Sequence, residues 1–331
     1  MWRRKGETDF VVLIGIARMA AESPLLEAKR RVDYFELGAR TYIARCDSPR
    51  MPFRHTINPY RGCEFACRYC YARYTHGFME LRDPLEFEQK IFAKRWNPVA
   101  FRAELAKIPR EEMIAIGTAT DPYQPSERRY GVTRSILRVF AGEHGRKLGI
   151  TTKSDLVSRD LDLLCTIARA NVLHVSITVT TTDAELARKM EPYAPRPELR
   201  LEALQQLVRA GLSAGVFMAP ALPYINDSEL EIDRVASAAA SAGASYFAGG
   251  SVFLREEARQ MMFPWIDEHF PHLSALYRRR FTGNAYLDDG YREKLAARME
   301  SARELYRLPP RPFDYHPELW SGEQQLSLFT L

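Results

Sequence analysis

Between residues 113 and 254 the chain alternates short apolar runs with segments of helical pattern, and this alternation restricts the fold more than any other feature. Val172–Val179, for example, is β-branched and almost continuously apolar, as is typical of a strand covered on both faces. Strands that alternate with helices at this spacing form a parallel sheet with right-handed crossovers. The expected strands are 113–118, 148–153, 172–179, 212–219 and 244–254, and the expected helices are 133–144, 159–169, 197–210 and 228–242.

A further strand is expected at about 55–58, which gives six strand–helix steps. Six steps are too few for a closed eightfold barrel. A chain of 331 residues has room for one barrel-sized domain with appendages, or for two domains. We therefore expect an α/β fold with four parts: an N-terminal extension at 1–50, the strand–helix unit at 51–256, a helical extension at 257–310 and a polar, flexible tail at 311–331.

Three cysteines lie within eight residues, at Cys63, Cys67 and Cys70, with the spacing C-x3-C-x2-C. Thiolates so close together suit one soft metal centre, such as an iron–sulfur cluster, zinc or copper(I). An iron–sulfur cube normally takes four thiolates. A cube held by three would leave one iron open, and an open coordination position distinguishes a catalytic metal from a structural one.

A structural zinc is the alternative for this motif, with His76 as the fourth ligand six residues after Cys70. Zinc ligands usually come as two pairs separated by a longer loop. No second pair is present, because Cys46 and Cys165 are isolated in the sequence. The spacing therefore favours the cluster.

Composition indicates a cytoplasmic protein. Five cysteines are too few and too clustered for a secreted disulfide framework, and no apolar run is long enough to span a membrane. The apolar run Phe10–Ala17 is short for a signal peptide, and Glu7 and Asp9 interrupt the charge pattern before it; Met19 as the true start is a competing explanation. The net charge of +5 permits nucleic acid as a partner without requiring it.

The cysteine motif, with an aromatic residue before its last cysteine, resembles that of the radical SAM enzymes. The longer string from Asn58 to Tyr71, Asn-Pro-Tyr-Arg-Gly-Cys-Glu-Phe-Ala-Cys-Arg-Tyr-Cys-Tyr, is similar to the branch related to spore photoproduct lyase. The resemblance covers about residues 52–256. It implies a partial six-stranded (β/α)6 barrel, a 4Fe-4S cluster on Cys63, Cys67 and Cys70, and S-adenosyl-L-methionine on the fourth iron.

The strand ends are where barrel enzymes place their chemistry. After the second strand the usual Gly-Gly-Glu of the family is missing, but Thr120-Asp121 matches the hydroxyl–carboxylate pair of the lyase branch, which would accept hydrogen bonds from the cofactor ammonium. Asp121-Pro122 could instead form a simple turn. By the same resemblance Lys153 would face the cofactor carboxylate, and Ser176 would lie near the ribose or carboxylate. A surface lysine and a serine bonded to its own backbone are the alternatives.

Tyr69 and Tyr71 flank Cys70, and the resemblance gives them a catalytic role as radical relays; shielding of the cluster from water is the alternative. One position departs from the lyase. Thr118 stands where the lyase has the cysteine that returns a hydrogen atom, and a threonine O–H bond is much stronger than a thiol S–H bond. We therefore do not expect repair by the hydrogen-return route of the lyase.

The last residues, Gln325, Leu326, Leu328 and Phe329, resemble the peptide by which bacterial DNA polymerases and repair proteins bind the sliding clamp. They follow a Pro-rich and polar stretch whose composition is that of a spacer. Docking of these apolar residues on the barrel, as a C-terminal lid, is the alternative.

The sequence as a whole predicts an enzyme that cleaves S-adenosyl-L-methionine with one electron and abstracts a hydrogen atom from a substrate, with damaged DNA as the expected substrate. A one-electron donor such as flavodoxin or ferredoxin would be required. A protein, RNA or metabolite substrate is the first alternative, and a zinc-stabilised DNA-binding adaptor without catalysis is the second.

Overall fold

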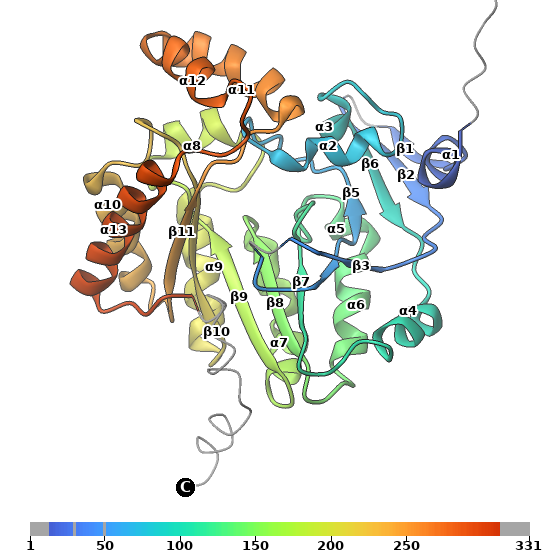
Figure 1. The fold of residues 1–331 in the computed structure, drawn as a ribbon. Helices are drawn as coiled ribbons and strands as arrows, with labels where there is room; N and C mark the ends of the chain where they lie inside the picture. The colour runs from blue at the N-terminus through green and yellow to red at the C-terminus, as the bar shows by residue number, and fades with distance from the viewer. Residues whose placement is uncertain (1–12, 29–30, 49–50, 312–331) are drawn as a thin grey trace, which may run out of the picture.

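Six parallel strands form the main sheet of the computed structural model, which describes residues 13–28, 31–48 and 51–311. The strands lie side by side in chain order, as the alternating pattern predicts, and Figure 1 shows the sheet curving around the centre of the molecule. A seventh strand, β3 (Ile43–Arg45), pairs antiparallel with the first. The parallel strands are β4 (His55–Ile57), β7 (Met113–Ile116), β8 (Lys147–Thr152), β9 (Val172–Thr178), β10 (Ser213–Ala221) and β11 (Phe247–Ser251).

The two faces of this sheet differ in side-chain size. Ile150, Val175 and Ala214 share one register and lie in the main hydrophobic core, with side chains of the helices that follow the strands. The residues next to these along each strand have small or polar side chains, and they point to the opposite face of the sheet, because successive side chains of a strand alternate between the two faces. This inner face includes Gly149, Thr151, His174, Ser176, Ser213 and Gly215.

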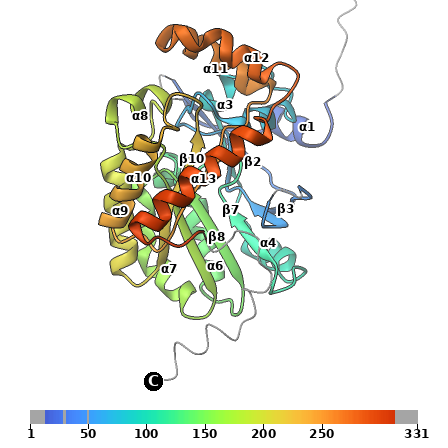
Figure 2. The same ribbon diagram turned by 60° about the vertical axis from the view of Figure 1, so that its left-hand side comes forward.

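The helices around the sheet begin and end largely where their caps predict. α9 (Pro197–Arg209) starts at its proline, and Gly211 follows its end with a φ of +82°. α10 (Glu229–Ser241) is capped by the Ser228 side chain. α7 departs from the expected boundary: a 3₁₀ segment occupies 155–160, capped by Ser154, so α7 (Leu161–Ala168) begins later than the expected residue 159. α6 (Val132–Phe140), α7, α9 and α10 lie along the outside of the sheet (Figure 2).

A second, four-stranded sheet stands at the N-terminal side and supports the start of the cysteine loop. Its strands, in spatial order, are β1 (Leu25–Ala28), β2 (Asp33–Leu37), β6 (Lys90–Lys94) and β5 (Tyr60–Arg61). The short helices of this part of the chain are α1 (Gly15–Ala21), α2 (Tyr74–Gly77), α3 (Glu86–Gln89), α4 (Pro98–Leu105) and α5 (Glu127–Tyr130); α3 packs on β6, whereas α4 packs on β3 and α6. Since β5 ends one residue before Gly62-Cys63, this sheet fixes where the cysteine loop begins.

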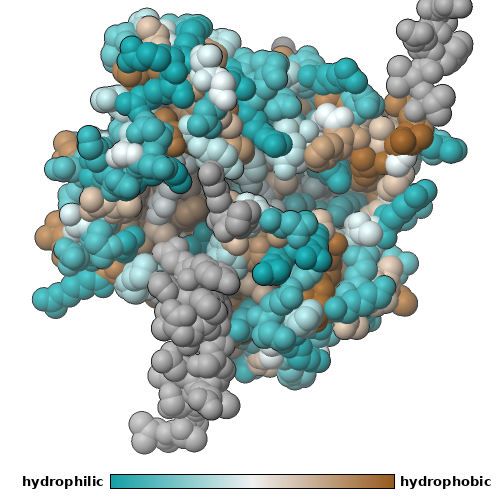
Figure 3. All heavy atoms as spheres, viewed as in Figure 1, coloured by the Kyte–Doolittle hydropathy of each residue, from teal (hydrophilic) through white to brown (hydrophobic). Residues whose placement is uncertain are grey.

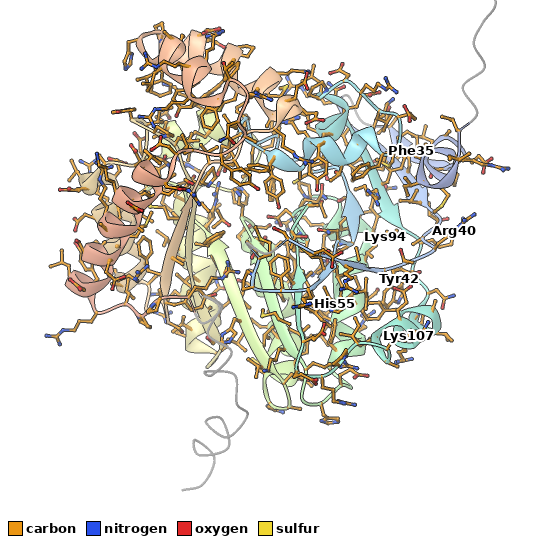
Figure 4. The ribbon with its side chains drawn as sticks, viewed as in Figure 1. Phe35, Arg40, Tyr42, His55, Lys94 and Lys107 are labelled. Carbon is orange, nitrogen blue, oxygen red and sulfur yellow. The ribbon has the colours of Figure 1, made fainter. Side chains whose placement is uncertain are left out.

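The segment between the two sheets is held by Tyr42. Its hydroxyl donates to the Arg95 carbonyl over 2.6 Å, and the Lys94 ammonium lies 6.0 Å from the centre of its ring (Figure 4). These contacts fix the segment that leads from β2 to β3.

The C-terminal helices cover the cysteine loop. α11 (Glu256–His269) and α12 (Ser274–Phe281) contribute to a second hydrophobic core, which includes Cys63, Cys67 and Tyr69 together with the end of α8 (Ala184–Met190). The last helix, α13 (Asp289–Tyr306), packs on α10 and β11. On the face drawn in Figure 3, the outer side of α11 and α12 is mostly hydrophilic. In the described part of the chain, no helix is long and apolar enough to cross a membrane.

Candidate active site

The cysteine loop is anchored at both ends by backbone hydrogen bonds. The Cys63 amide donates to the Phe87 carbonyl over 2.9 Å, and the Arg68 amide donates to the Met190 carbonyl over 2.9 Å. Gly62 has a φ of +81°, and a Cβ there would lie 2.7 Å from the Lys90 carbonyl oxygen. Only glycine fits this close approach of the loop to β6.

The three thiols of this loop are unpaired and shielded from solvent, with Cys63 9% and Cys67 8% exposed. Burial raises the pKa of all three, that of Cys67 to about 12, so that each would be a neutral thiol without a metal. A bound metal centre deprotonates its thiols outright. Three free thiols in one anchored loop, two of them on buried residues, therefore have the donor chemistry that an iron–sulfur cluster requires.

His76 is engaged elsewhere. Its Nε2 lies 3.0 Å from the Lys90 carbonyl oxygen, and its ring packs against Phe87 at 5.1 Å. Within the described ranges, no three His, Cys, Asp or Glu side chains converge on the position of a single metal ion. The cysteines of a cube bind different iron atoms and need not converge in this way. These observations give no support to the zinc alternative.

The loop after β7 places Asp121 beside the cysteines. Its carboxylate accepts hydrogen bonds from the Thr152 hydroxyl at 2.6 Å, the Lys153 amide at 2.7 Å and the Tyr123 amide at 2.9 Å. Burial raises its pKa, and these three donors oppose the rise. The Thr120 hydroxyl, one residue before Asp121, donates to the Gly62 carbonyl over 2.6 Å, which brings this loop against the residue before Cys63; Asp121 also raises the pKa of Cys63 electrostatically.

Thr120 has a different environment. Its buried hydroxyl donates to the Gly62 carbonyl over 2.6 Å and accepts from the Gln124 side chain at 2.8 Å. These bonds hold the cysteine loop against the end of β7. The role of this hydroxyl as a cofactor ligand stays a prediction, and the structure adds a positioning role.

Lys153, directly after β8, points toward the cysteines. Its ammonium lies 5.7 Å from the centre of the Tyr69 ring and has no hydrogen-bond acceptor among the described residues. Burial alone would lower its pKa, but Cys67 and Glu191 more than compensate, and the pKa is raised. The group is therefore a cation within reach of the loop, as binding of an anionic ligand requires.

Ser176 lies on the inner face of β9, and its hydroxyl is 2.9 Å from that of Tyr246. Tyr246 in turn donates to the Val175 carbonyl over 2.8 Å, and its ring occupies the space beside Gly215. Ser176 is thus fully buried within a side-chain pair in the structure. Its assignment to the cofactor stays a prediction.

The two tyrosines that flank Cys70 differ in their surroundings. Tyr69 is buried, and its hydroxyl donates to the Glu191 carboxylate. Tyr71 is 40% exposed; its hydroxyl donates to the Thr118 carbonyl, and its ring lies 6.0 Å from that of Phe253. Tyr71 is therefore open to solvent, whereas Tyr69 belongs to the interior; the catalytic role of both as radical relays stays a prediction.

Sequence reasoning missed Glu191 and Arg200, which form a buried ion pair of 2.5 Å beneath the cysteine loop. Glu191 lies 122 residues from its partner Tyr69, so local patterns give no sign of the contact. A buried Glu and a buried Arg are rare enough to attract attention, but only the fold shows that they are buried here.

The family model described as the radical SAM superfamily matches residues 57–234. An uncharacterized protein of Mycobacterium tuberculosis (strain ATCC 25618 / H37Rv) is 36% identical over 259 residues, which cover 78% of this chain and 76% of that protein. An uncharacterized protein of Methanocaldococcus jannaschii is 26% identical over 240 residues, covering 71% of this chain and 84% of that protein.

Among solved structures, spore photoproduct lyase complexed with dinucleoside spore photoproduct has a TM-score of 0.63 at 17% identity, covering 82% of this chain and 79% of the lyase. A double mutant of the lyase, with bound AdoMet and the same dinucleoside, has a TM-score of 0.62 at the same identity and coverage. At this identity the likeness shows the fold alone. The family model matches more than half of the residues, and it confirms the resemblance carried by the cysteine motif: the chain belongs to the radical SAM superfamily.

Proposed function

We propose that this protein binds a 4Fe-4S cluster through Cys63, Cys67 and Cys70 and uses it to cleave S-adenosyl-L-methionine. When bound, the cluster supplies the electron that releases a 5′-deoxyadenosyl radical, which then abstracts a hydrogen atom from the substrate. The observation that carries the proposal is the anchored loop with three free thiols, of which Cys63 and Cys67 are buried and Cys70 is partly buried. Two charged side chains near it, Asp121 and Lys153, have the signs needed for the amino and carboxylate groups of the cofactor.

The protein supplies binding and shielding, and the cofactors supply the chemistry. Lys153 would pair with the cofactor carboxylate, and the free lone pairs of Asp121 would accept from its ammonium. α11 and α12 exclude water from the loop by packing apolar side chains on it. Electrons would come from a one-electron donor such as flavodoxin or ferredoxin, and the protein would work in the cytoplasm.

We favour damaged DNA as the substrate. The likeness in fold to spore photoproduct lyase, the net positive charge and the C-terminal sequence support this choice. Because Thr118 stands where the lyase has its hydrogen-donating cysteine, we expect the substrate radical to have a different fate from accepting a hydrogen atom from a thiol at this position. The hydroxyl of Thr118 forms hydrogen bonds with the Asn58 side chain, at 3.1 Å from the amide nitrogen, and this residue has no thiol to offer. The reaction is therefore a related repair step or a modification.

The test is anaerobic incubation of the iron-loaded protein with S-adenosyl-L-methionine, a reductant and oligonucleotides that carry defined lesions. Liquid chromatography would follow 5′-deoxyadenosine, and mass spectrometry would follow the oligonucleotide. We expect 5′-deoxyadenosine to form together with a mass change in one lesion.

The cysteine variants provide the control. Cys67→Ala should lose both iron and 5′-deoxyadenosine formation, whereas Cys165→Ala, outside the loop, should keep both. A Cys67→Ala protein with full iron content would contradict the cluster assignment. Cofactor cleavage in the parent without any change to DNA would favour a protein, RNA or metabolite as the substrate.

A further inference from the structure

A buried charged network lies next to the cysteine loop, and it joins Tyr69 of the loop to Glu191, 122 residues later in the sequence. Glu191, the residue after α8, is 1% exposed. One of its carboxylate oxygens accepts from the Tyr69 hydroxyl and, at 3.1 Å, from the Thr180 hydroxyl. The other lies 2.5 Å from the Arg200 guanidinium. Glu191 therefore connects the cysteine loop with the segment after β9 and with α9.

The guanidinium of Arg200 is held by several partners in this network. Besides its ion pair with Glu191, it donates to the Pro195 carbonyl over 2.7 Å and to the Thr178 carbonyl over 3.1 Å. Its side chain is 1% exposed, so it is not available to a ligand. The Lys153 ammonium, by contrast, lies 5.7 Å from the centre of the Tyr69 ring and donates no hydrogen bond to a described residue.

Tyr69 is the link between this network and the metal-binding loop. It stands between Cys67 and Cys70, so that a shift of its ring also shifts the backbone that carries both thiols. The ring lies 5.7 Å from the Lys153 ammonium, and its hydroxyl is held by a carboxylate whose other oxygen is fixed by Arg200. Hydrogen bonds to a charged acceptor are among the stronger ones in proteins. The position of the Tyr69 ring is therefore set by Glu191 and, through it, by Arg200.

We infer that Glu191 is a positioning residue for S-adenosyl-L-methionine: through the Tyr69 hydroxyl it fixes the ring beside Cys67 and Cys70, and by pairing with Arg200 it leaves Lys153 as the cation that meets the cofactor. The inference rests on the proposed function and assigns Glu191 no contact with the cofactor.

Two substitutions test this arrangement in the full-length, iron-loaded protein. Tyr69→Phe removes only the hydroxyl and keeps the ring, while Glu191→Gln keeps the shape of the side chain and removes its charge. We expect each variant to retain its iron and to bind S-adenosyl-L-methionine roughly 10- to 100-fold more weakly by anaerobic calorimetry, as is usual when a residue that orients a ligand is lost. The change that the cofactor produces in the electron paramagnetic resonance spectrum of the reduced cluster should weaken in parallel.

The double variant separates this role from a general loss of stability. If Glu191 acts through Tyr69, the double variant should bind the cofactor no more weakly than the weaker single variant, because the two changes break the same link. The chain offers a control in Tyr306 of α13, whose hydroxyl donates to the Asp233 carboxylate of α10 over 2.9 Å. Tyr306→Phe removes a tyrosine–carboxylate bond away from the cysteine loop and should leave the cofactor affinity unchanged.

Each result either supports or overturns the role of Glu191 as a positioning residue. Parental cofactor affinity in Tyr69→Phe would overturn the inference, even if Glu191→Gln failed to fold because it leaves Arg200 unpaired. Losses that multiply in the double variant, or an equal loss in Tyr306→Phe, would overturn it as well. A parent protein that takes up no iron would instead overturn the proposed function, and this inference with it.

Discussion

At the scale of single residues, burial changes the charge state of His76. The side chain is 1% exposed, and desolvation lowers its pKa from the ordinary 6.5 to about 4, although the hydrogen bond to the Lys90 carbonyl opposes this. Burial lowers the pKa of His174 to about 4 in the same way. Between pH 6.5 and 4 the unfolded chain therefore binds protons that the folded protein does not, and stability must fall as the pH falls through this range.

For His76 alone the linkage amounts to about 2 kcal/mol of unfolding free energy lost between pH 7 and pH 5. His76→Asn should be less stable than the parent at pH 7, because it loses the packing of the ring on Phe87. It should lose less stability on acidification, because it has no imidazole to protonate. Urea unfolding of the iron-free protein at both pH values measures the difference, with exposed His144→Asn as the control. Equal losses of stability in the parent and in His76→Asn would show that His76 does not carry this dependence.

At the scale of elements, the sequence predicts what local patterns encode. The β-branched run of β9, the proline that starts α9 and the glycine after it all gave boundaries close to those observed. The four-stranded sheet was missed because β2 pairs with β6, more than fifty residues away, and β5 is only two residues long. Contacts of this range are not encoded in any short window of the sequence. The same limit hid Glu191, whereas the cysteine motif can be recognised in the sequence because its spacing is local.

The helical extension expected at 257–310 is confirmed, and the packing of its first helix, α11, makes that helix part of the site. Ile266 is fully buried in the core that contains Cys63, Cys67 and Tyr69. Ile266→Ala should cost about 2–5 kcal/mol of unfolding free energy, since it leaves a cavity. Loosening of α11 should also speed cluster loss in air, which the decay of the visible absorbance would report.

Leu305 on α13 provides the control for this prediction, because its side chain is 67% exposed. Leu305→Ala should change both stability and cluster lifetime little. If the cluster of Ile266→Ala decays at the parental rate despite the loss of stability, α11 does not protect the loop.

At the scale of the whole molecule, the cysteine loop lies between two supports that the strand–helix pattern does not include. The small N-terminal sheet fixes the start of the loop through Gly62 and the Phe87 carbonyl, and α11 and α12 cover it from the other side. The barrel thus supplies the strand ends, and the segments before and after it complete the site. The residues that resemble a clamp-binding peptide lie outside the described ranges, and their role stays a proposal.

The tail gives the last prediction, because it would determine where the enzyme works. Gln325 to Phe329 presents a polar anchor followed by apolar side chains, which suits a short peptide that fills a preformed groove. A peptide of residues 320–331 should bind the bacterial sliding clamp with micromolar affinity, roughly −8 kcal/mol, by calorimetry. Tethering to the clamp would raise the effective concentration of the barrel at DNA. Replacing Leu328 and Phe329 with Ala should abolish binding while the full-length variant keeps its iron content. If the parent peptide shows no heat of binding at high concentration, the tail has another role, and the strongest sequence argument for DNA as the substrate is lost.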